Sequence, residues 1–201
     1  MAAPRIEFWF DFGSNYSYLA MMRIHALAAP AGVQVILRPF LLGPIFKSLG
    51  WETSPFVLQK LKGDYTWRDM ERQCAKYGLA WQHPTTFPRR ALLPARLAVV
   101  AASEPWLPEF CRRIMQANFA QDADIEDIAV VSTILTRLGQ IPDLWIAMAN
   151  SHQAKALLRA QTDEAAQRGI FGAPTFFVNG EMYWGNDRLD DAIASVVAAR
   201  K

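Results

Sequence analysis

The chain opens with an apolar pattern typical of a buried strand and then changes to helical spacing. Residues Arg5 to Phe12 read RIEFWFDF, with apolar side chains at alternate positions. A turn over Gly13 to Ser17 follows, and helical spacing continues from about Tyr16 to Ala29. A second strand is predicted over Val33 to Phe40. These elements form a β-α-β unit, whose strands we expect to be parallel.

The middle of the chain has a different pattern. From about Leu41 to Asn150 apolar residues recur at helical spacing, strand patterns nearly vanish, and prolines and glycines separate the segments. The predicted helices cover Phe56–Lys60, Tyr65–Tyr77, Leu92–Ala102, Leu107–Ala120, Ile128–Leu138 and Leu144–Ala149.

The C-terminal part returns to mixed structure. A helix is predicted over Ala154–Arg168, and two short apolar strands, Thr175–Val178 and Glu181–Trp184, flank an Asn-Gly pair. Asn-Gly between apolar runs is a strong hairpin signal, because both residues tolerate positive φ. A last helix is predicted over Arg188–Ala199. The order predicts an α/β, thioredoxin-like domain (residues 1–40 and 151–201) with an all-helical insertion domain (residues 41–150).

Composition limits the partners. The 201 residues are 52% hydrophobic, enough for a sizeable core. The formal net charge is only +2, and the doublets Arg89-Arg90 and Arg112-Arg113 are short, so we interpret both as solvated surface. We see no charged-then-apolar leader and no apolar run of roughly 20 residues, the length of a membrane span. We therefore expect a cytoplasmic protein with neither a nucleic-acid nor a membrane partner.

The cysteines and histidines give no redox or metal motif. Cys74 and Cys111 lie far apart inside helical patterns, without CxxC spacing, and the three histidines are scattered. We expect two reduced, partly buried thiols and no metal site.

The first candidate for chemistry is Ser14, between a strand and a helix. The N-terminus of a helix carries unpaired N–H groups and positive potential, which stabilise an anion such as a thiolate. Ser14 could donate its hydroxyl to that thiolate. The alternative is that Ser14 is an ordinary N-cap, with Ser17 as a second candidate.

Two further candidate segments lie near the C-terminus. Ala173-Pro174 precedes the hairpin, where the sequence leaves the peptide isomer open and proline is also an ordinary first residue of a strand. Asn186-Asp187 opens the final helix, either as an N-cap or as a site for the ammonium and carboxylate groups of a γ-glutamyl end.

Four segments resemble a known family in matching order over nearly the whole chain. They are FDFGSNYSYLA (Phe10–Ala20), RPFLLGPIFKSLG (Arg38–Gly50), KGDYTWRDMER (Lys62–Arg72) and GIFGAPTFFVNGEMYWGNDRLDD (Gly169–Asp191). They resemble the 2-hydroxychromene-2-carboxylate isomerases and the kappa-class glutathione transferases, both in the DsbA-like branch of the thioredoxin fold.

The resemblance implies a glutathione site. It places Ser14 where the family's catalytic serine activates the glutathione sulfur. It places Ala173 and Pro174 on the backbone segment that pairs with the cysteinyl unit before a cis-proline. It places Asn186 and Asp187 at the γ-glutamyl end.

The resemblance also assigns two lysines and shows two departures. Lys62 matches a basic residue that meets a glutathione carboxylate, and Lys47 matches a lysine near the active site, our first choice for the substrate carboxylate. Solvated helix charges are the alternative for both. Asn15 stands where many relatives have proline, and Trp51 where many have an asparagine that contacts glutathione.

Aromatic residues are candidates for a substrate pocket. Trp51, Trp67, Trp81 and Tyr16 could shape a pocket for an aromatic substrate, with core packing as the competing interpretation.

The reaction that the resemblance implies uses glutathione as a cofactor. Its thiolate adds to an unsaturated carbon, the bond rotates, and the thiolate is expelled, which interconverts 2-hydroxychromene-2-carboxylate and trans-o-hydroxybenzylidenepyruvate. The resemblance also implies a homodimer. A kappa-like transferase or peroxidase and a non-catalytic thioredoxin-fold binding protein stay open. Serines replace both sulfurs of a CxxC at Ser14 and Ser17, which excludes dithiol exchange there.

Overall fold

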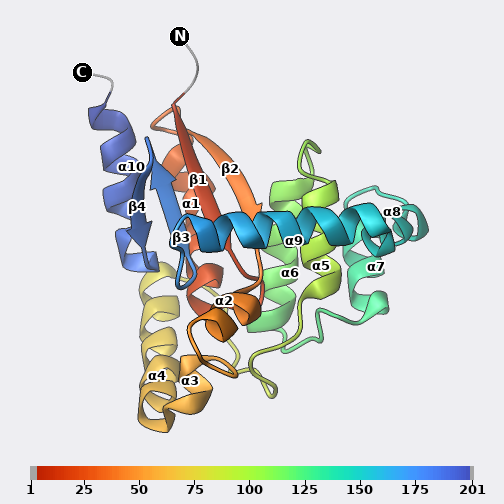
Figure 1. Cartoon of the computed structure of the whole chain (residues 1–201), viewed down its shortest axis with the longest axis horizontal. Coiled ribbons are helices and arrows are strands. Elements are labelled where there is room, and N and C mark those ends of the chain that lie inside the picture. The colour runs from red at the N-terminus through yellow and green to blue at the C-terminus, as the bar shows by residue number, and fades with distance from the viewer. Residues whose placement is uncertain (1–3, 200–201) are drawn as a thin grey trace.

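The sheet follows the predicted strands closely. A computed structural model describes residues 4–199. Its strands are β1 (Arg5–Phe10), β2 (Gln34–Pro39), β3 (Thr175–Val178) and β4 (Glu181–Trp184), in the order β2-β1-β3-β4 (Figure 1). β2 is parallel to β1, while β3 is antiparallel to both β1 and β4. The predicted β-α-β unit and hairpin are confirmed.

Helices surround this sheet and fill the middle of the described chain. Their bounds are α1 (Asn15–Ala28), α2 (Leu42–Ser48), α3 (Pro55–Leu58), α4 (Lys60–Tyr77), α5 (Leu92–Val100), α6 (Leu107–Ala120), α7 (Ile128–Arg137), α8 (Pro142–Asn150), α9 (His152–Gln167), the short 3₁₀ helix η1 (Asn186–Arg188) and α10 (Leu189–Ala198).

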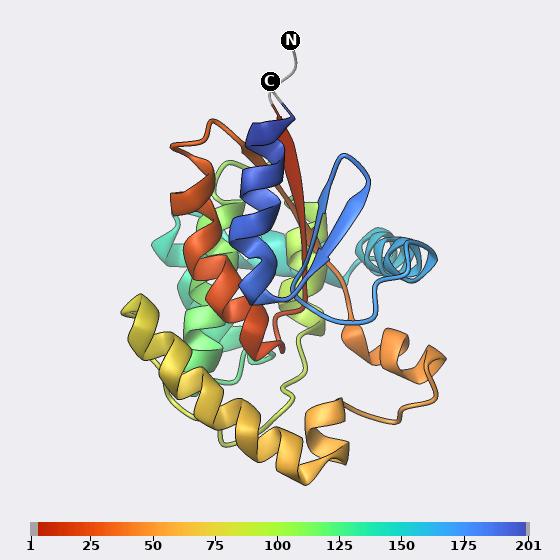
Figure 2. The ribbon, with the colours of Figure 1, turned by 90° about the vertical axis from the view of Figure 1, so that its left-hand side faces the viewer.

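The alternation along β1 separates two apolar layers. Ile6, Phe8 and Phe10 are fully buried in the cluster that includes side chains of α1, α6 and α10. Trp9 points to the other face and packs with Phe177 in a smaller cluster that includes α9. Figure 2 shows α1 and α10 side by side on one face of the sheet and α9 on the other. Because side chains alternate along β1, its apolar residues lie on both faces of the sheet.

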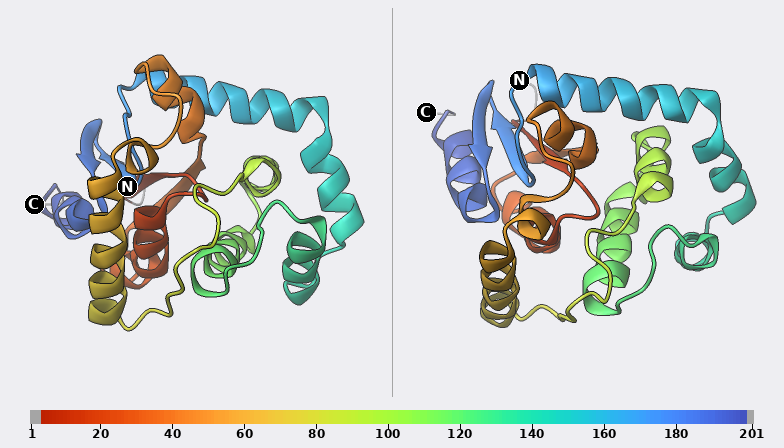
Figure 3. Two further views of the ribbon diagram at one scale, coloured as in Figure 1. Left: turned by 90° about the horizontal axis from the view of Figure 1, so that it is seen from below. Right: turned by 60° about the horizontal axis from the view of Figure 1, so that its bottom comes forward.

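The helices between β2 and α9 share their core with the sheet. Phe110 and Ile114 of α6 and Leu135 of α7 belong to the same buried cluster as Phe8 and Phe10. The long helix α9 then runs from α8 back to the sheet (Figures 1 and 3). The sheet and the helices between β2 and α9 therefore share one buried core, and α9 connects α8 with the sheet.

Several elements differ from the predictions: α4 begins at Lys60 rather than Tyr65, and the end of β1 and the unpredicted helix α2 share one cause. β1 ends at Phe10, because the Asp11 carboxylate turns to accept the N–H groups of Gly13 and Leu42, each at 2.7 Å. The second of these bonds caps α2, a helix that the sequence analysis missed. The predicted final helix begins with a 3₁₀ turn, η1, before α10.

The structure bears on the expectations for the two cysteines and for a membrane-spanning helix. Cys74 and Cys111 are both free and buried, and burial raises the pKa of the Cys74 thiol to about 11. Neither is poised as a nucleophile at neutral pH. Within residues 4–199, no helix combines the length and apolar character that crossing a membrane requires.

Gly63 allows α3 to pack tightly on α4. A Cβ atom added there would lie 2.2 Å from the backbone oxygen of Phe56, which cannot move as a flexible side chain would. We expect Gly63→Ala to lower the free energy of unfolding by about 1–3 kcal/mol, measured by urea denaturation.

Gly43→Ala in α2 is the matched control, since an added Cβ meets nothing within 4 Å. It should be neutral or stabilising by up to about 1 kcal/mol, because alanine favours helices. Equal stabilities of the two variants would contradict this account of the α3–α4 contact.

Candidate active site

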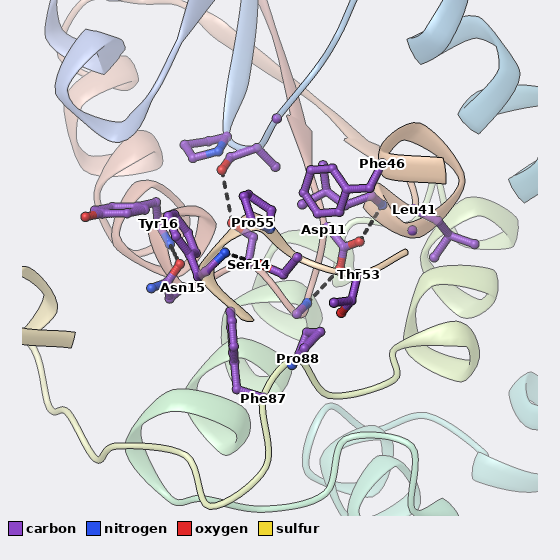
Figure 4. A pocket seen from close by; sticks show the side chains of 18 of the residues that line it. Asp11, Ser14, Asn15, Tyr16, Leu41, Phe46, Thr53, Pro55, Phe87 and Pro88 are labelled. Carbon is purple, nitrogen blue, oxygen red and sulfur yellow. Dashed lines mark hydrogen bonds between the residues drawn. The ribbon is translucent and has the colours of Figure 1, made fainter. Parts of the chain in front are cut away.

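A cavity of about 1020 Å³ lies beside the N-terminus of α1. Its walls come from the β1–α1 turn, from α2 and the loop after it, from α3 and α4, and from residues 87–92, 171–174 and 184–187. In the close-up, Asn15 and Tyr16 lie on one side of Ser14, Leu41 and Phe46 on the other, and Phe87 and Pro88 below it (Figure 4). The fold thus gathers segments from residues 11–92 and 171–187 around Ser14.

The hydroxyl of Ser14 makes two hydrogen bonds. It accepts the N–H of Ser17 at 3.2 Å, as an N-cap, and donates to the carbonyl oxygen of Ala173 at 3.0 Å. The peptide bond between Ala173 and Pro174 is cis. Ser14 is therefore an N-cap whose hydroxyl also contacts the segment before the cis-proline, an arrangement compatible with the predicted role beside a thiolate.

The N-terminus of α1 keeps donors without partners. The side chain of Asn15 accepts the N–H of Tyr16 at 3.0 Å, and Ser14 accepts that of Ser17, but the N–H of Asn15 bonds to no group among the described residues. The Asn15 side chain is 1% exposed, and its Nδ2 is buried without a partner. Unpaired donors at the positive end of a helix suit an anionic ligand, so the residues present fit a thiolate beside Ser14.

Asp11 is a cavity residue that the sequence analysis did not identify. Burial raises the pKa of its carboxyl group, while its bonds from the N–H groups of Leu42 and Gly13 act in the opposite direction. It joins the turn before Ser14 to the start of α2. The signal that could have identified Asp11 is an acidic residue at the end of an aromatic strand, two positions before Gly13.

Asn186 and Asp187 line the cavity without capping the final helix through their side chains. Asn186 is buried and accepts a hydrogen bond from Arg23 at 3.1 Å. The Asp187 carboxylate is largely exposed and lies 3.0 Å from the guanidinium of Arg188. The N-cap alternative fails here, which leaves the Asp187 carboxylate accessible to a ligand.

The two predicted lysines lie in different places. Lys62 lines the cavity from α4, whereas Lys47 is exposed on α2 and is not among the lining residues. Of the two lysines, Lys62 therefore contributes a cation to the cavity and Lys47 does not.

Two of the four aromatic candidates line the cavity and two do not. Trp51 lines the cavity, 39% exposed, with its ring centroid 5.7 Å from that of Phe46. Tyr16 lines it too and donates to Asp69 at 2.8 Å; burial and this carboxylate raise the pKa of the phenol, which stays neutral. Trp67 and Trp81 stack on each other at 6.0 Å and pack against the core. Core packing is thus the correct interpretation for the last two.

The interpretation of Arg89 as solvated surface was wrong. Its side chain is only 6% exposed and pairs with Asp122, and it also donates to the Asn118 side chain at 2.9 Å. Asn118 in turn donates to the carbonyl of Phe12 at 3.0 Å. The Arg89 carbonyl lies so close to Gly13 that an added Cβ would be 3.0 Å away. Arg89 therefore fastens residues 87–90 to the turn that carries Ser14.

The chain is similar to known proteins over most of its length. Residues 5–195 match the DSBA-like thioredoxin domain family. A 2-hydroxychromene-2-carboxylate isomerase of Sphingobium xenophagum is 30% identical over 188 residues, covering 92% of this chain and 94% of that protein. A glutathione S-transferase kappa 2 of Caenorhabditis elegans is 23% identical, covering 92% and 88%.

A solved structure is also close. That of a 2-hydroxychromene-2-carboxylate isomerase superposes with a TM-score of 0.87 at 25% identity, covering 98% of this chain and 96% of its own. The predicted α/β, thioredoxin-like fold with added helices is confirmed.

The Arg89–Asp122 pair gives a pH-dependent prediction. The Arg89 hydrogen bond holds the pKa of the Asp122 carboxyl group below its ordinary value, so the pair stabilises the fold above the unfolded-state pKa of about 3.9. This contribution is lost as the pH falls through the folded-state pKa. Asp122→Asn should lower the urea midpoint at neutral pH, and the difference from the wild type should shrink toward pH 3.

Asparagine suits the variant because Asp122 has a φ of 52°, which asparagine tolerates. Asp163→Asn, an exposed carboxylate in the middle of α9, is the control and should differ little from the wild type at any pH. A difference in urea midpoint between Asp122→Asn and the wild type that does not change with pH would contradict the ion-pair explanation.

Proposed function

The chain belongs to the 2-hydroxychromene-2-carboxylate isomerase family of DSBA-like thioredoxin domains, and from this premise we propose that it is a glutathione-dependent isomerase of an unsaturated aromatic keto acid. The observation that carries the proposal is the contact between the Ser14 hydroxyl and the carbonyl of Ala173, at the mouth of a helix with unpaired donors. The isomerase relatives supply the reaction class.

The cavity offers a matching group for each part of glutathione. Ser14 would hold the sulfur, and the backbone at Ala173 and Pro174 the cysteinyl unit. Lys62 would take a carboxylate of the tripeptide, and Asn186 and Asp187 the γ-glutamyl ammonium and carboxylate. These assignments follow the resemblance, and all of these residues line one cavity.

When bound, glutathione would supply a thiolate nucleophile that adds reversibly to the substrate double bond. The chain's part is to favour the charged sulfur. A hydroxyl hydrogen rotates to suit its partner, so the Ser14 O–H can leave the Ala173 carbonyl and donate to an anion. The unpaired N–H of Asn15 and the positive end of α1 add to the same effect.

Apolar side chains of the cavity would bind the substrate. Leu41, Phe46, Trp51 and Phe87 all line the cavity, and they offer a surface for an aromatic ring. Exclusion of water by such a surface strengthens the hydrogen bonds at the sulfur. The proposal further includes a small aromatic substrate, a cytoplasmic location and a homodimer, which rest on the sequence analysis.

Replacing Ser14 tests the role of its hydroxyl. Ser14→Ala should lower glutathione-dependent kcat by about 10²-fold or more, the usual cost of one lost stabilising donor. Loss of the cap should cost only about 1 kcal/mol of stability, so the variant should stay folded at 25 °C.

Ser17→Ala is the control, because Ser17 lies on the same turn of α1, its hydroxyl is buried without a partner, and it does not line the cavity. Its turnover should match the wild type. Turnover of Ser14→Ala within a few fold of that of Ser17→Ala would refute the assignment.

The fate of glutathione separates the competing functions. An isomerase regenerates it, so its concentration should stay constant over many turnovers of the keto acid, followed by thiol titration. Consumption of one glutathione per product would indicate a kappa-like transferase. Absence of measurable binding in calorimetry at millimolar glutathione would favour a non-catalytic binding protein.

A further inference from the structure

The charged residues that line the cavity are mostly paired inside the protein. Asp11 accepts two backbone N–H groups, Asp69 accepts the Tyr16 hydroxyl, Arg89 pairs with Asp122, and Asp187 pairs with an exposed arginine. In residues 4–199, no hydrogen bond or ion pair involves the charged groups of the three others. These are Glu52, Lys62 and Arg90. The cavity therefore holds two unpaired cations on separate segments.

The backbone on the N-terminal side of Arg90 is anchored close to the turn that carries Ser14. Arg90 follows Arg89, whose side chain is tied to Asn118 and Asp122 and whose carbonyl lies against Gly13. The side chain of Arg90 itself is exposed and lines the cavity.

The segment that carries Arg90 also brings apolar side chains to the cavity. Phe87, Pro88 and Leu92 line the same cavity, and the close-up shows Phe87 and Pro88 directly below Ser14 (Figure 4). An unpaired guanidinium within an apolar wall fits a ligand that has both an aromatic ring and a carboxylate. Guanidinium groups bind carboxylates through two parallel hydrogen bonds, which also fixes the orientation of the ligand.

We infer that Arg90 binds the carboxylate of the aromatic keto acid and so orients its double bond toward Ser14. The inference rests on the proposed function. It replaces Lys47, which does not line the cavity, as the partner of the substrate carboxylate. Lys62 remains for glutathione, because it lies on α4 and outside the wall formed by residues 87–92.

Equilibrium binding without glutathione tests Arg90 separately from catalysis. The probe is benzylidenepyruvate, which lacks the ortho hydroxyl and cannot close the chromene ring, together with its methyl ester. Arg90→Gln should raise the Kd of the acid by about 10- to 100-fold in calorimetry, the range for a hydrogen-bonded charged group, and that of the ester by no more than about twofold. Arg90→Lys should restore part of the affinity for the acid.

Arg72→Gln is the matched control, since Arg72 is an exposed arginine on α4 that does not line the cavity. It should bind both probes as the wild type does. In kinetics, Arg90→Gln should raise KM for the acid and leave the affinity for glutathione unchanged.

Several results would overturn the inference. They are equal binding of acid and ester by the wild type, no measurable binding of the acid, an acid-specific loss in Lys47→Gln or Lys62→Gln but not in Arg90→Gln, or loss of glutathione affinity in Arg90→Gln. If the wild type binds the acid through Arg90 but does not interconvert 2-hydroxychromene-2-carboxylate and trans-o-hydroxybenzylidenepyruvate with glutathione, the proposed function fails while the Arg90 contact stands.

Discussion

One hydroxyl group joins the two halves of the site. The Ser14 side chain accepts the N–H of Ser17 within α1 and donates to the carbonyl of Ala173, 159 positions away. The first bond holds the start of the helix in shape, and the second brings the segment before β3 against it. A ligand that enters between them meets a donor that can turn toward it, beside the unpaired N–H of Asn15.

Two buried charges keep that arrangement in place. Asp11 ties the turn before Ser14 to α2, and Arg89 ties residues 87–90 to the same turn through Asn118 and Asp122. Buried charges are costly without partners, and both are satisfied by several hydrogen bonds. Because these residues are occupied with the scaffold, the remaining cations at the cavity, Lys62 and Arg90, are available to acidic ligands.

Local sequence patterns were sufficient to predict the sheet, but not to predict α2 or the burial of Arg89. The alternation in β1 and the Asn-Gly turn before β4 specify strands within a few residues, and both predictions were correct. α2 was missed because its capping group, Asp11, lies 31 positions earlier, so no local signal marks its start. The burial of Arg89 likewise depends on Asp122, which only the folded chain brings near. Ser14 and Ala173 were paired by resemblance, since no periodicity connects positions so far apart.

The central claim is that the mouth of α1 stabilises a sulfur anion, and the pKa of the bound glutathione thiol measures this directly. Ultraviolet absorbance of the thiolate, followed against pH with saturating glutathione, gives that value for the wild type and for Ser14→Ala. The account predicts a bound pKa well below the value of about 8.5 for a free cysteine thiol, and a clear rise toward it in the variant. A bound pKa equal to that of free glutathione, or the same depressed value in both proteins, would contradict it.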